Sequence, residues 1–381
     1  MKERRYAVFG AGRQGRAAAY DLARFGNASE VLIADRDPYA AGSAEVEVND
    51  LLGKKVVRSL RIDVADSMEM RRVLWGIDGF VGAMHYALNH ALTKTAIENG
   101  CHMVDLGGNT GVVLKQHELH RQAASVCVSI IPDCGMAPGF DVNLACHVLG
   151  QFARPEKLTI YCGGIPQRPK PPLGYHFPFA LSGLVNECSG YADIINDGEV
   201  TQMSTLFSFE EIALPEIGLL EATHTSGGLS TAPWTLQAKY PTLRTLEYKT
   251  LRYPGHWKIL RDLTKEGRLA DGLKEFESKE RASPHDPEDI GIVSVHGHGL
   301  TKDGKALTVI AEVVDRYDAV TGFTAMQRLT GFHASIALIA ATERLTVGGV
   351  HAVESLDPKM VVDEFAKRGI TVDETHAVCS K

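Results

Sequence analysis

Three glycines near the start of the chain have the spacing of a phosphate-binding turn. They are Gly10, Gly12 and Gly15, in the sequence GAGRQG. An apolar run precedes them, a segment with alanine and leucine at helical spacing follows, and a second apolar run ends in Asp35. In that context the first glycine permits a tight turn, the second lets the backbone approach a pyrophosphate, and the third allows a helix to pack closely on a strand. The spacing therefore predicts a site for an adenine dinucleotide, with its phosphates at the N-terminus of the helix.

The acid at the end of the second apolar run indicates which dinucleotide is preferred. We expect Asp35 to accept hydrogen bonds from the adenosine ribose, and a carboxylate there repels a 2′-phosphate, so the sequence favours NAD over NADP. Arg36 follows it directly and softens that preference. The other residues expected to contact the cofactor are Arg13, Gln14, Asp63 and Met84. The alternative is a glycine-rich turn in some other α/β fold.

Strands and helices are expected to alternate through the first third of the chain. Helices are predicted at 67–75, 90–99 and 116–124, between apolar runs that predict strands at 5–9, 31–35, 60–66, 79–84, 102–108 and 128–135. This alternation predicts an α/β fold with a doubly wound parallel sheet of the Rossmann type. Ligands of such sheets bind beyond the carboxyl ends of the strands, which here are followed by residues 84–86, 105–110 and 133–138.

The middle of the chain has a different pattern. After a helix at 141–150, a strand is expected at 158–166, a half-buried strand at 245–256, and a hairpin about the turn at 301–304. These elements predict an α+β domain with a largely antiparallel sheet, for substrate binding and dimerisation. The charged segment 277–289 is expected to be a surface loop.

A strongly apolar helix at 325–345, with a last helix at 358–368, follows the expected antiparallel sheet. Because this helix is strongly apolar, its surface must be buried against another element. We expect it to pack on the nucleotide domain. The predicted division is therefore a dinucleotide-binding domain at 1–138, completed by about 326–381, and a substrate domain at 139–325.

Composition excludes several classes of protein. The 381 residues carry 40 lysines and arginines against 47 acids, a net charge of −7, which argues against a partner such as nucleic acid. No apolar run is long enough to predict a membrane span. The seven cysteines include no CxxC pair, and the N-terminal apolar stretch is broken by glycines, so we expect reduced thiols, no metal site and a cytoplasmic location.

Motifs along the chain resemble the saccharopine reductase and L-lysine 6-dehydrogenase family. The matching segments, in order, are DLGGNTG (105–111), DCGMAPG (133–139), YCGGIP (161–166), PPLGYHF (171–177), HTSGG (224–228) and LEYKTLRYPGH (246–256). The chain resembles the lysine enzyme most closely, because saccharopine reductases carry an aspartate where this chain has Ala137. The cysteine of YCGG, Cys162, is instead shared with the saccharopine reductases, which leaves the amino donor open.

The resemblance implies oxidation of the ε-amine carbon of L-lysine by NAD, giving an imine that water hydrolyses to the semialdehyde and ammonia. Such a reaction needs a proton acceptor, because a free lysine amine has a pKa of about 10.4. His224, His85, Tyr86 and Lys249 are the candidate catalytic residues. Each also has a structural alternative: a hydrogen-bonded histidine, loop packing for the His85–Tyr86 pair, or a solvated lysine.

An anchor for the substrate α-carboxylate is also needed. Arg252 is the candidate, because a guanidinium offers a planar two-point fork, and a surface salt bridge is its alternative. If Lys249 flanks the same cleft, each cation lowers the pKa of the other. Further candidates for substrate contact are Asp105, Thr110 and Cys162. The alternative for Asp105 is a structural role, capping backbone groups at the end of its strand, and the alternative for Cys162 is an inert buried thiol.

Three functions therefore compete. The first is an NAD-dependent amino-acid dehydrogenase acting on lysine. The second is a saccharopine- or carboxynorspermidine-type reductase, which forms secondary amines by reducing an imine. The third is a nucleotide-binding protein without catalysis. A homodimer is expected by analogy alone.

Overall fold

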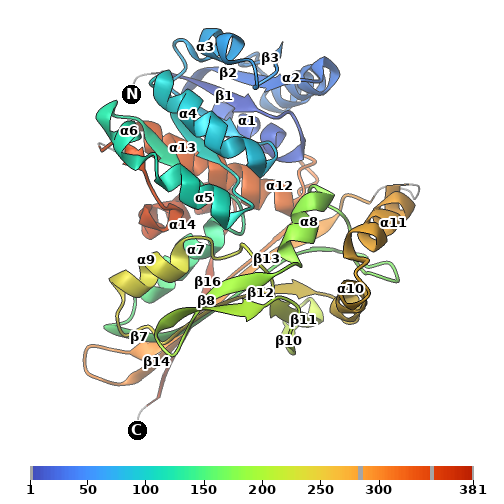
Figure 1. Cartoon of the computed structure of the whole chain (residues 1–381), viewed down its shortest axis with the longest axis vertical. Coiled ribbons are helices and arrows are strands. Elements are labelled where there is room, and N and C mark those ends of the chain that lie inside the picture. The colour runs from blue at the N-terminus through green and yellow to red at the C-terminus, as the bar shows by residue number, and fades with distance from the viewer. Residues whose placement is uncertain (1–2, 282–285, 344–346, 380–381) are drawn as a thin grey trace. The chain divides into compact units, whose positions relative to one another are not determined.

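The chain folds into two units in the computed structural model, which describes residues 3–281, 286–343 and 347–379 (Figure 1). Unit 1 comprises Met1–Phe140 and Gln327–Phe365, and unit 2 comprises Asp141–Met326 and Ala366–Lys381. The division differs from the expected one at the end of the chain, where residues after Phe365 belong to unit 2. Their strand, β16 (Asp373–Cys379), pairs with a strand of that unit.

Unit 1 is built on a seven-stranded sheet in which every pair of neighbouring strands is parallel, in the order β15-β6-β5-β4-β1-β2-β3. The strands are β1 (Arg4–Phe9), β2 (Ala28–Asp35), β3 (Val57–Arg61), β4 (Gly79–Gly82), β5 (His102–Asp105), β6 (Ser129–Ile131) and β15 (Gly349–Val350). This order confirms the predicted Rossmann-type fold, and it brings all carboxyl ends to one edge of the sheet.

Helices cover both faces of this sheet. The helices of unit 1 are α1 (Arg13–Phe25), α2 (Pro38–Leu52), α3 (Ser67–Leu74), α4 (Asn89–Glu98), α5 (Thr110–His117), α6 (His120–Ser125) and α13 (His333–Glu343), with 3-10 turns at Tyr86–Leu88 and Val353–Ser355. Helix α14 (Pro358–Lys367) begins in unit 1, where its Phe365 packs against Phe140 and His333. Alternate strand residues separate the two faces: a Cβ at Gly79 would meet Leu338 of α13, whereas the neighbouring Phe80 shares an apolar cluster with Leu92 and Ala96 of α4.

Several expected elements of unit 1 have different bounds in the structure. The strands expected to end at 84, 108 and 135 end at Gly82, Asp105 and Ile131. The third strand ends at Arg61 rather than at 66, because Asp66 caps α3 by accepting hydrogen bonds from the backbone N–H groups of Met68 and Glu69. The helix expected at 116–124 is two helices, and the first begins at Thr110 because the side chain of Asn109 caps it.

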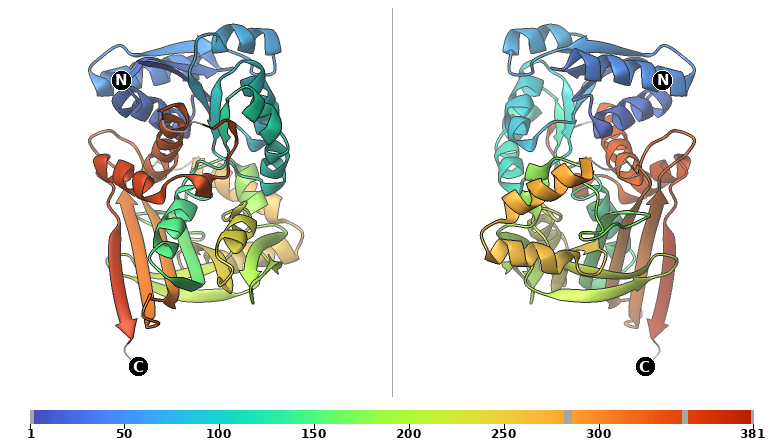
Figure 2. Two further views of the ribbon diagram at one scale, coloured as in Figure 1. Left: turned by 90° about the vertical axis from the view of Figure 1, so that its left-hand side faces the viewer. Right: turned by 90° about the vertical axis from the view of Figure 1, so that its right-hand side faces the viewer.

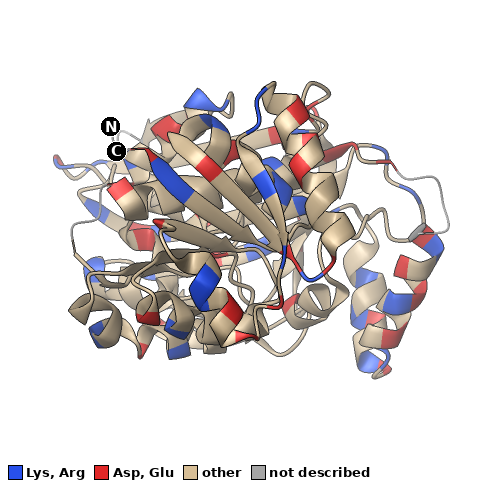
Figure 3. Cartoon of the chain, turned by 90° about the horizontal axis from the view of Figure 1, so that it is seen from above, with Lys and Arg blue, Asp and Glu red and all other residues tan. Residues whose placement is uncertain are grey.

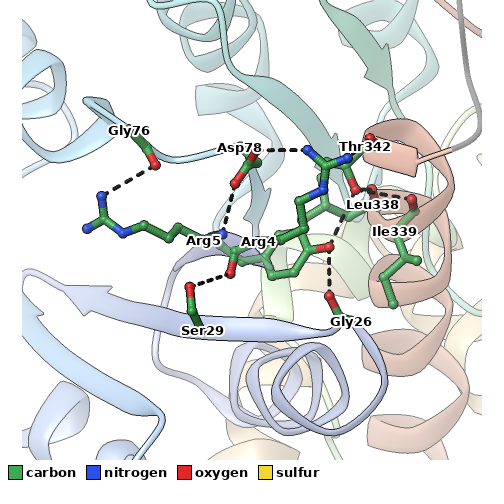
Figure 4. A network of polar contacts seen from close by, with 10 residues as sticks. Arg4, Arg5, Gly26, Ser29, Gly76, Asp78, Leu338, Ile339 and Thr342 are labelled. Carbon is green, nitrogen blue, oxygen red and sulfur yellow. Dashed lines mark hydrogen bonds and ion pairs between the residues drawn. The ribbon is translucent and has the colours of Figure 1, made fainter. Parts of the chain in front are cut away.

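The apolar segment after unit 2 returns to unit 1 as one nearly continuous helix. It consists of α12 (Ala325–Gln327), a π-helical turn (Arg328–Phe332) and α13, and α13 packs on β4, β5 and β6. Residues 344–345 of the expected helix lie outside the described residues. Figure 4 shows how the end of α13 is held: Arg4 donates to Asp78 Oδ1 and to the carbonyl of Thr342, both over 2.9 Å. A cation at this position also suits the negative end of the helix dipole.

Replacing Arg4 by methionine should lower the free energy of unfolding by about 1–2 kcal/mol, because two hydrogen bonds of a half-buried guanidinium are lost. Arg58→Met is the matched control, since Arg58 forms one ion pair with Glu30 at the surface and is 72% exposed; its change should stay within about 0.5 kcal/mol. Denaturant titration measures both values. Equal losses in the two variants would contradict the role given to Arg4.

Unit 2 is built on a nine-stranded mixed sheet. Its main path has the order β10-β11-β12-β7-β13-β14-β16, and β8 and β9 form a hairpin beside β12. The bounds are β7 (Arg154–Pro166), β8 (Tyr191–Asn196), β9 (Glu199–Ser204), β10 (Phe209–Leu214), β11 (Gly218–His224), β12 (Thr245–Arg252), β13 (Asp289–Leu300), β14 (Ala306–Arg316) and the edge strand β16. Among the strand pairs of this sheet that the structure describes, only β7 and β12 are parallel, so the expected largely antiparallel sheet is confirmed.

The edge strand β16 was not expected from the sequence. Figure 2 shows it beside β14. Its Glu374 carboxylate is bound by two residues of unit 2, lying 2.6 Å from His147 Nε2 and accepting from Gln151 Nε2 over 3.1 Å.

The helices of unit 2 are α7 (Phe140–Leu149), α8 (Leu181–Glu187), α9 (Ala232–Lys239), α10 (His256–Lys265) and α11 (Leu269–Arg281). The segment 277–289 was expected to be a loop, but 277–281 belong to α11, which has the sequence LADGLKEFESKER and carries both acidic and basic residues. Figure 3 shows the charged residues along the chain. Residues 282–285 lie outside the described part of the chain. Among the described residues, no helix combines the length and apolarity that crossing a membrane requires.

Candidate functional site

The glycine turn between β1 and α1 has one open position and two closed ones. Gly10 has a φ of +106°, and a Cβ there would overlap the carbonyl oxygen of Ala83. A Cβ at Gly15 would overlap the carbonyl oxygen of Gly10. At Gly12, by contrast, a Cβ would meet no atom within 4 Å. Gly10 and Gly15 are therefore required by the fold, whereas the space above Gly12 is available to a ligand.

The first turn of α1 lies directly behind this open position. Gly12 is the N-cap residue, and no side chain caps the helix. Its first-turn N–H groups have no acceptors within an α-helix, and the helix dipole adds a partial positive charge. Arg13, the first helical residue, is exposed. The open glycine, the uncapped helix and the arginine together fit the diphosphate of a dinucleotide.

Asp35, at the end of β2, is occupied by the backbone of the glycine turn. Its Oδ2 accepts from the N–H of Ala11 over 2.8 Å, and its Oδ1 accepts from the N–H of Asp37 over 3.0 Å. Arg36 is exposed. Asp63, also exposed, accepts from the N–H of Ala65 over 3.0 Å. The structure thus places these residues at the edge of the sheet where the cofactor is expected. Asp35, which was expected to bind the adenosine ribose, also accepts a hydrogen bond from the backbone of the glycine turn.

Met84, His85 and Tyr86 follow β4 at the same edge. A Cβ at Gly10 would meet the Met84 side chain at 3.1 Å, so Met84 lies against the glycine turn. His85 is exposed; its Nδ1 accepts from the N–H of Ala87 over 3.3 Å, which caps the short 3-10 turn. The two aromatic rings, of His85 and Tyr86, lie 4.2 Å apart.

Asp105 is fully buried at the end of β5 and binds three groups of unit 1. Its Oδ1 accepts from the N–H of Gly107 over 2.8 Å, and its Oδ2 accepts from Gln116 Nε2 over 2.7 Å. The N–H of Asp133 lies 3.4 Å from Oδ1. Burial raises the pKa of Asp105 to about 6, against the effect of these hydrogen bonds. Of the two roles left open by the sequence, this geometry favours structural capping over substrate contact. Thr110 is half-buried at the start of α5.

The pKa of Asp105 predicts a pH-dependent stability. Because its folded-state pKa lies above the ordinary value of 3.8, the folded state holds a proton that the unfolded state has lost between about pH 4 and 6. Wild-type stability therefore falls as the pH rises through this window, by about 2–3 kcal/mol for two pKa units. Asp105→Asn should remove that fall. The Oε1 of Gln116, which has no partner among the described residues, can then accept from the new amide. Urea titrations at pH 4 and pH 7 measure the free energy of unfolding of both proteins. If the variant and the wild type differed in this free energy by the same amount at both pH values, the assignment would be contradicted.

In unit 2 the two faces of β12 carry two separate groups of polar residues. Lys249 pairs across the strands with His224, and Thr250 pairs with Cys162. Side chains alternate along a strand, so Lys249 and Arg252, three residues apart, lie on opposite faces. The hypothesis that both cations flank one cleft is wrong. We call the two faces of the sheet the Arg252 face and the Lys249 face.

On the Arg252 face, Arg252 is 3% exposed and its guanidinium lies over aromatic rings. Its Cζ lies 4.5 Å from the ring centre of Tyr175 and 5.4 Å from that of Trp257. Its Nη2 lies 3.6 Å from Glu187 Oε1, and its Nη1 donates to the carbonyl of Leu251 over 2.8 Å. Its Nε is buried and has no hydrogen-bond partner among the described residues. Arg252 is therefore not part of a surface salt bridge.

Glu187 is a functional candidate that the sequence reasoning did not include. It accepts from Thr250 Oγ1 over 3.1 Å, and burial raises its pKa while Arg252 opposes that rise. Cys162 lies on the same face with a thiol whose pKa is raised by burial. His256 packs edge-on against Tyr175, and burial lowers its pKa to about 3, so its imidazole is neutral. The signal in the sequence was the lone acid of FALSGLVNEC, an otherwise uncharged segment.

The Lys249 face holds a chain of contacts between polar and charged side chains. His224 Nε2 lies 3.3 Å from Glu247 Oε1, and Lys249 Nζ lies 3.6 Å from Glu247 Oε2 and 3.1 Å from Glu210 Oε1. The hydrogen bond from His224 lowers the pKa of Glu247, and burial together with Glu210 raises that of Tyr161. The structure thus brings His224 and Lys249 together but places them on the face opposite Arg252 and Cys162.

Comparison with known proteins gives matches along almost the whole chain. Residues 6–131 match the family model described as the saccharopine dehydrogenase NADP binding domain, and residues 135–370 match the saccharopine dehydrogenase C-terminal domain. A saccharopine dehydrogenase [NADP(+), L-glutamate-forming] of Saccharomyces cerevisiae is 22% identical over 231 residues, which is 58% of this chain and 50% of that protein. An alpha-aminoadipic semialdehyde synthase of Arabidopsis thaliana is 25% identical over 150 residues, 38% of this chain and 14% of that protein. The chain therefore spans half or less of the length of these two relatives.

A solved structure has a similar fold. The apo saccharopine dehydrogenase (L-Glu forming) of Saccharomyces cerevisiae aligns over 98% of this chain and 100% of its own, with a TM-score of 0.78 and 17% identity. A Rossmann-type unit with an open glycine turn, joined to a unit with a mixed sheet, defines a class of two-unit dinucleotide-binding proteins. Within that class, the chain belongs to the saccharopine dehydrogenase family.

Proposed function

We propose that the chain is an oxidoreductase that uses a nicotinamide dinucleotide to act on a carbon–nitrogen bond of an amino acid, and that its substrate is the ε-amine of L-lysine. The observation that carries this proposal is the open position at Gly12 in front of the uncapped α1, in a chain of this family. In the proposed reaction the amine carbon loses a hydride and its nitrogen a proton, which gives an imine. Water then hydrolyses the imine to the semialdehyde and ammonia.

The bound dinucleotide would supply the hydride acceptor at its nicotinamide ring. Residues of the chain would bind the dinucleotide and the substrate and accept the proton. In unit 1, the N–H groups of the first turn of α1 and the side chain of Arg13 would bind the diphosphate. Met84, against the glycine turn, and Tyr86 are proposed to contact the cofactor beyond β4. The proposal gives Asp105 no chemical role, since its carboxylate already binds Gly107 and Gln116.

Arg252 is proposed to bind the substrate α-carboxylate. Its planar fork can accept a carboxylate at two points, and its Nε has no partner among the described residues. Contact with the rings of Tyr175 and Trp257 restrains the guanidinium before substrate arrives, which lowers the entropy lost on binding.

Glu187 is proposed as the proton acceptor for the substrate ammonium. It lies on the same face as Arg252, and its pKa is raised by burial, which makes a carboxylate a stronger base. His224 and Lys249, the acceptors expected from the sequence, lie on the other face, so neither shares a surface with Arg252 in unit 2. We therefore prefer Glu187 for this role.

A saccharopine-type reductase is the second candidate. The S. cerevisiae relative is named as a saccharopine dehydrogenase, and Cys162 lies on the Arg252 face, where the resemblance places a cysteine near substrate. A panel of amines, with NAD and with NADP, followed at the nicotinamide absorbance, separates the candidates. Reduction of the dinucleotide with lysine as the only active amine supports a lysine dehydrogenase. Oxidation of the reduced dinucleotide only in the presence of glutamate plus the semialdehyde supports a saccharopine-type reductase. Cofactor binding without turnover of any amine would leave a nucleotide-binding protein without catalysis.

NADP is proposed as the preferred dinucleotide, in place of the NAD favoured from the sequence. Asp35 binds the N–H of Ala11, so its charge is partly neutralised, and the exposed Arg36 beside it can pair with a 2′-phosphate. The family model that residues 6–131 match is also described as an NADP binding domain. Arg36→Ala should then weaken NADP binding about tenfold and leave NAD binding unchanged, as one charge-assisted contact is lost. Fluorescence titration with the two reduced dinucleotides measures this ratio, and equal effects on both would contradict a 2′-phosphate contact.

A further inference from the structure

Residues from the far end of the chain lie directly behind the glycine turn. Gln327, which is 7% exposed, donates from Nε2 to the carbonyl oxygen of Arg13 over 3.0 Å. A Cβ at Gly331 would lie 2.7 Å from Ala17 Cβ and 2.9 Å from the carbonyl oxygen of Gln14. The returning segment 327–332 therefore contacts the backbone of the first turn of α1 at two consecutive residues, across more than 300 positions of sequence.

The hydrogen bond from Gln327 acts on a peptide group that faces the expected diphosphate. The carbonyl of Arg13 and the N–H of Gln14 belong to one peptide unit, and that N–H is among the first-turn donors of α1. A donor bound at the carbonyl oxygen polarises the peptide and makes its N–H a stronger donor. The hydrogen bond also fixes the orientation of this peptide group, so less conformational entropy is lost when a ligand binds.

The absence of a side chain at Gly331 lets the returning segment approach α1 closely enough for Gln327 to bind the carbonyl of Arg13. Any side chain there would push the returning segment away from Gln14 and Ala17, because the clashing atoms include α1 backbone. The contact lies in the π-helical turn Arg328–Phe332. Such turns are rare and are frequently found at functional sites. Three features of one segment thus converge on the same turn of α1.

We propose that Gln327 is a positioning residue for the dinucleotide diphosphate, acting through the Arg13–Gln14 peptide, and that Gly331 permits its approach. This inference rests on the proposed function, since it assumes that a dinucleotide binds at the glycine turn. It assigns to the returning segment a role in cofactor binding in addition to its role in the core of unit 1.

Two substitutions of Gln327 test the proposal. Gln327→Met keeps the size and removes the donor, so the Kd for reduced NADP should rise about five- to tenfold, the effect of one lost hydrogen bond. Gln327→Glu replaces the donor by an acceptor that repels the carbonyl of Arg13, and its Kd should rise further. In both variants kcat and the KM for the amine should stay at the wild-type values, while the KM for the dinucleotide rises. A general loss of structure would not produce that split.

Thr342→Val is the matched control. Thr342 lies near the end of α13 (Figure 4). Its Oγ1 lies 3.4 Å from the hydroxyl of Tyr6, which is in the first half of β1, whereas the glycine turn follows the end of that strand. Its Kd for reduced NADP should equal that of the wild type. An unchanged Kd in a folded Gln327→Met protein, or an equal rise in the control, would overturn the inference while leaving the proposed function intact. A wild-type protein that binds no dinucleotide would overturn both.

Discussion

Gly12→Val abolishes tight dinucleotide binding while the protein remains folded: this is the largest effect that we expect. The backbone at Gly12 has φ −72° and ψ −173°, an extended conformation open to any residue, and no atom of the chain lies within 4 Å of the added Cβ. The side chain would instead fill the space that the diphosphate needs. We expect the Kd to rise at least about 100-fold, because the backbone can no longer approach the phosphates. The free energy of unfolding should change by no more than about 1 kcal/mol, the effect of an altered N-cap.

Gly42→Val is the control for this variant. Gly42 lies within α2, and a Cβ there also meets no atom within 4 Å. Calorimetric titration with reduced NADP and thermal denaturation should find both its affinity and its Tm close to those of the wild type. Unchanged dinucleotide affinity in Gly12→Val would contradict the assignment of the glycine turn.

Arg252→Lys should raise the KM for the amine substrate about 10- to 100-fold and leave the Kd for the dinucleotide unchanged. A lysine keeps the charge but cannot form the two-point fork, nor can it keep the contacts of the guanidinium with the rings of Tyr175 and Trp257. The partner carboxylate of Glu187 stays paired with a cation, so the substitution should not leave a buried charge alone. Steady-state kinetics with the amine varied at saturating dinucleotide measures this effect.

Arg244→Lys provides the comparison. Arg244 precedes β12 and forms an exposed ion pair with Asp197, over 3.4 Å. Its kinetic constants should match those of the wild type. If Arg252→Lys gave an unchanged amine KM, the guanidinium would be a structural group of the Arg252 face and the substrate carboxylate would bind elsewhere.

The first part of the fold was predictable because local signals and the overall topology agree there. Each βαβ step combines an apolar strand, a helical repeat and a turn residue, and such units close into a parallel sheet in only one hand. The glycine turn could be predicted for the same reason. The details that the sequence did not predict depend on single side chains, such as the Asn109 cap that starts α5 six residues early.

The candidate site was less predictable, because it depends on which face of a strand a residue occupies and on distant segments. Lys249 and Arg252 are close in sequence, and counting strand parity from the apolar Leu246 and Leu251 would have been ambiguous, since both are buried. Asp35 was expected to serve a ribose, yet it also binds the N–H of Ala11, a contact that only the folded turn creates. The edge strand β16 carries the polar sequence DETHAVC and lacks the apolar pattern of an interior strand.

Deuterium transfer tests the central claim most directly. The protein would be incubated with reduced dinucleotide dideuterated at nicotinamide C4 and with the semialdehyde, in the presence of ammonia or of glutamate, and the amine products analysed by mass spectrometry. The proposed function predicts one deuterium on the carbon bonded to nitrogen: in lysine if the chain is a lysine dehydrogenase, and in the secondary amine if it is a saccharopine-type reductase. Oxidation of the cofactor with no deuterium in any amine, or no reaction under either condition, would contradict it.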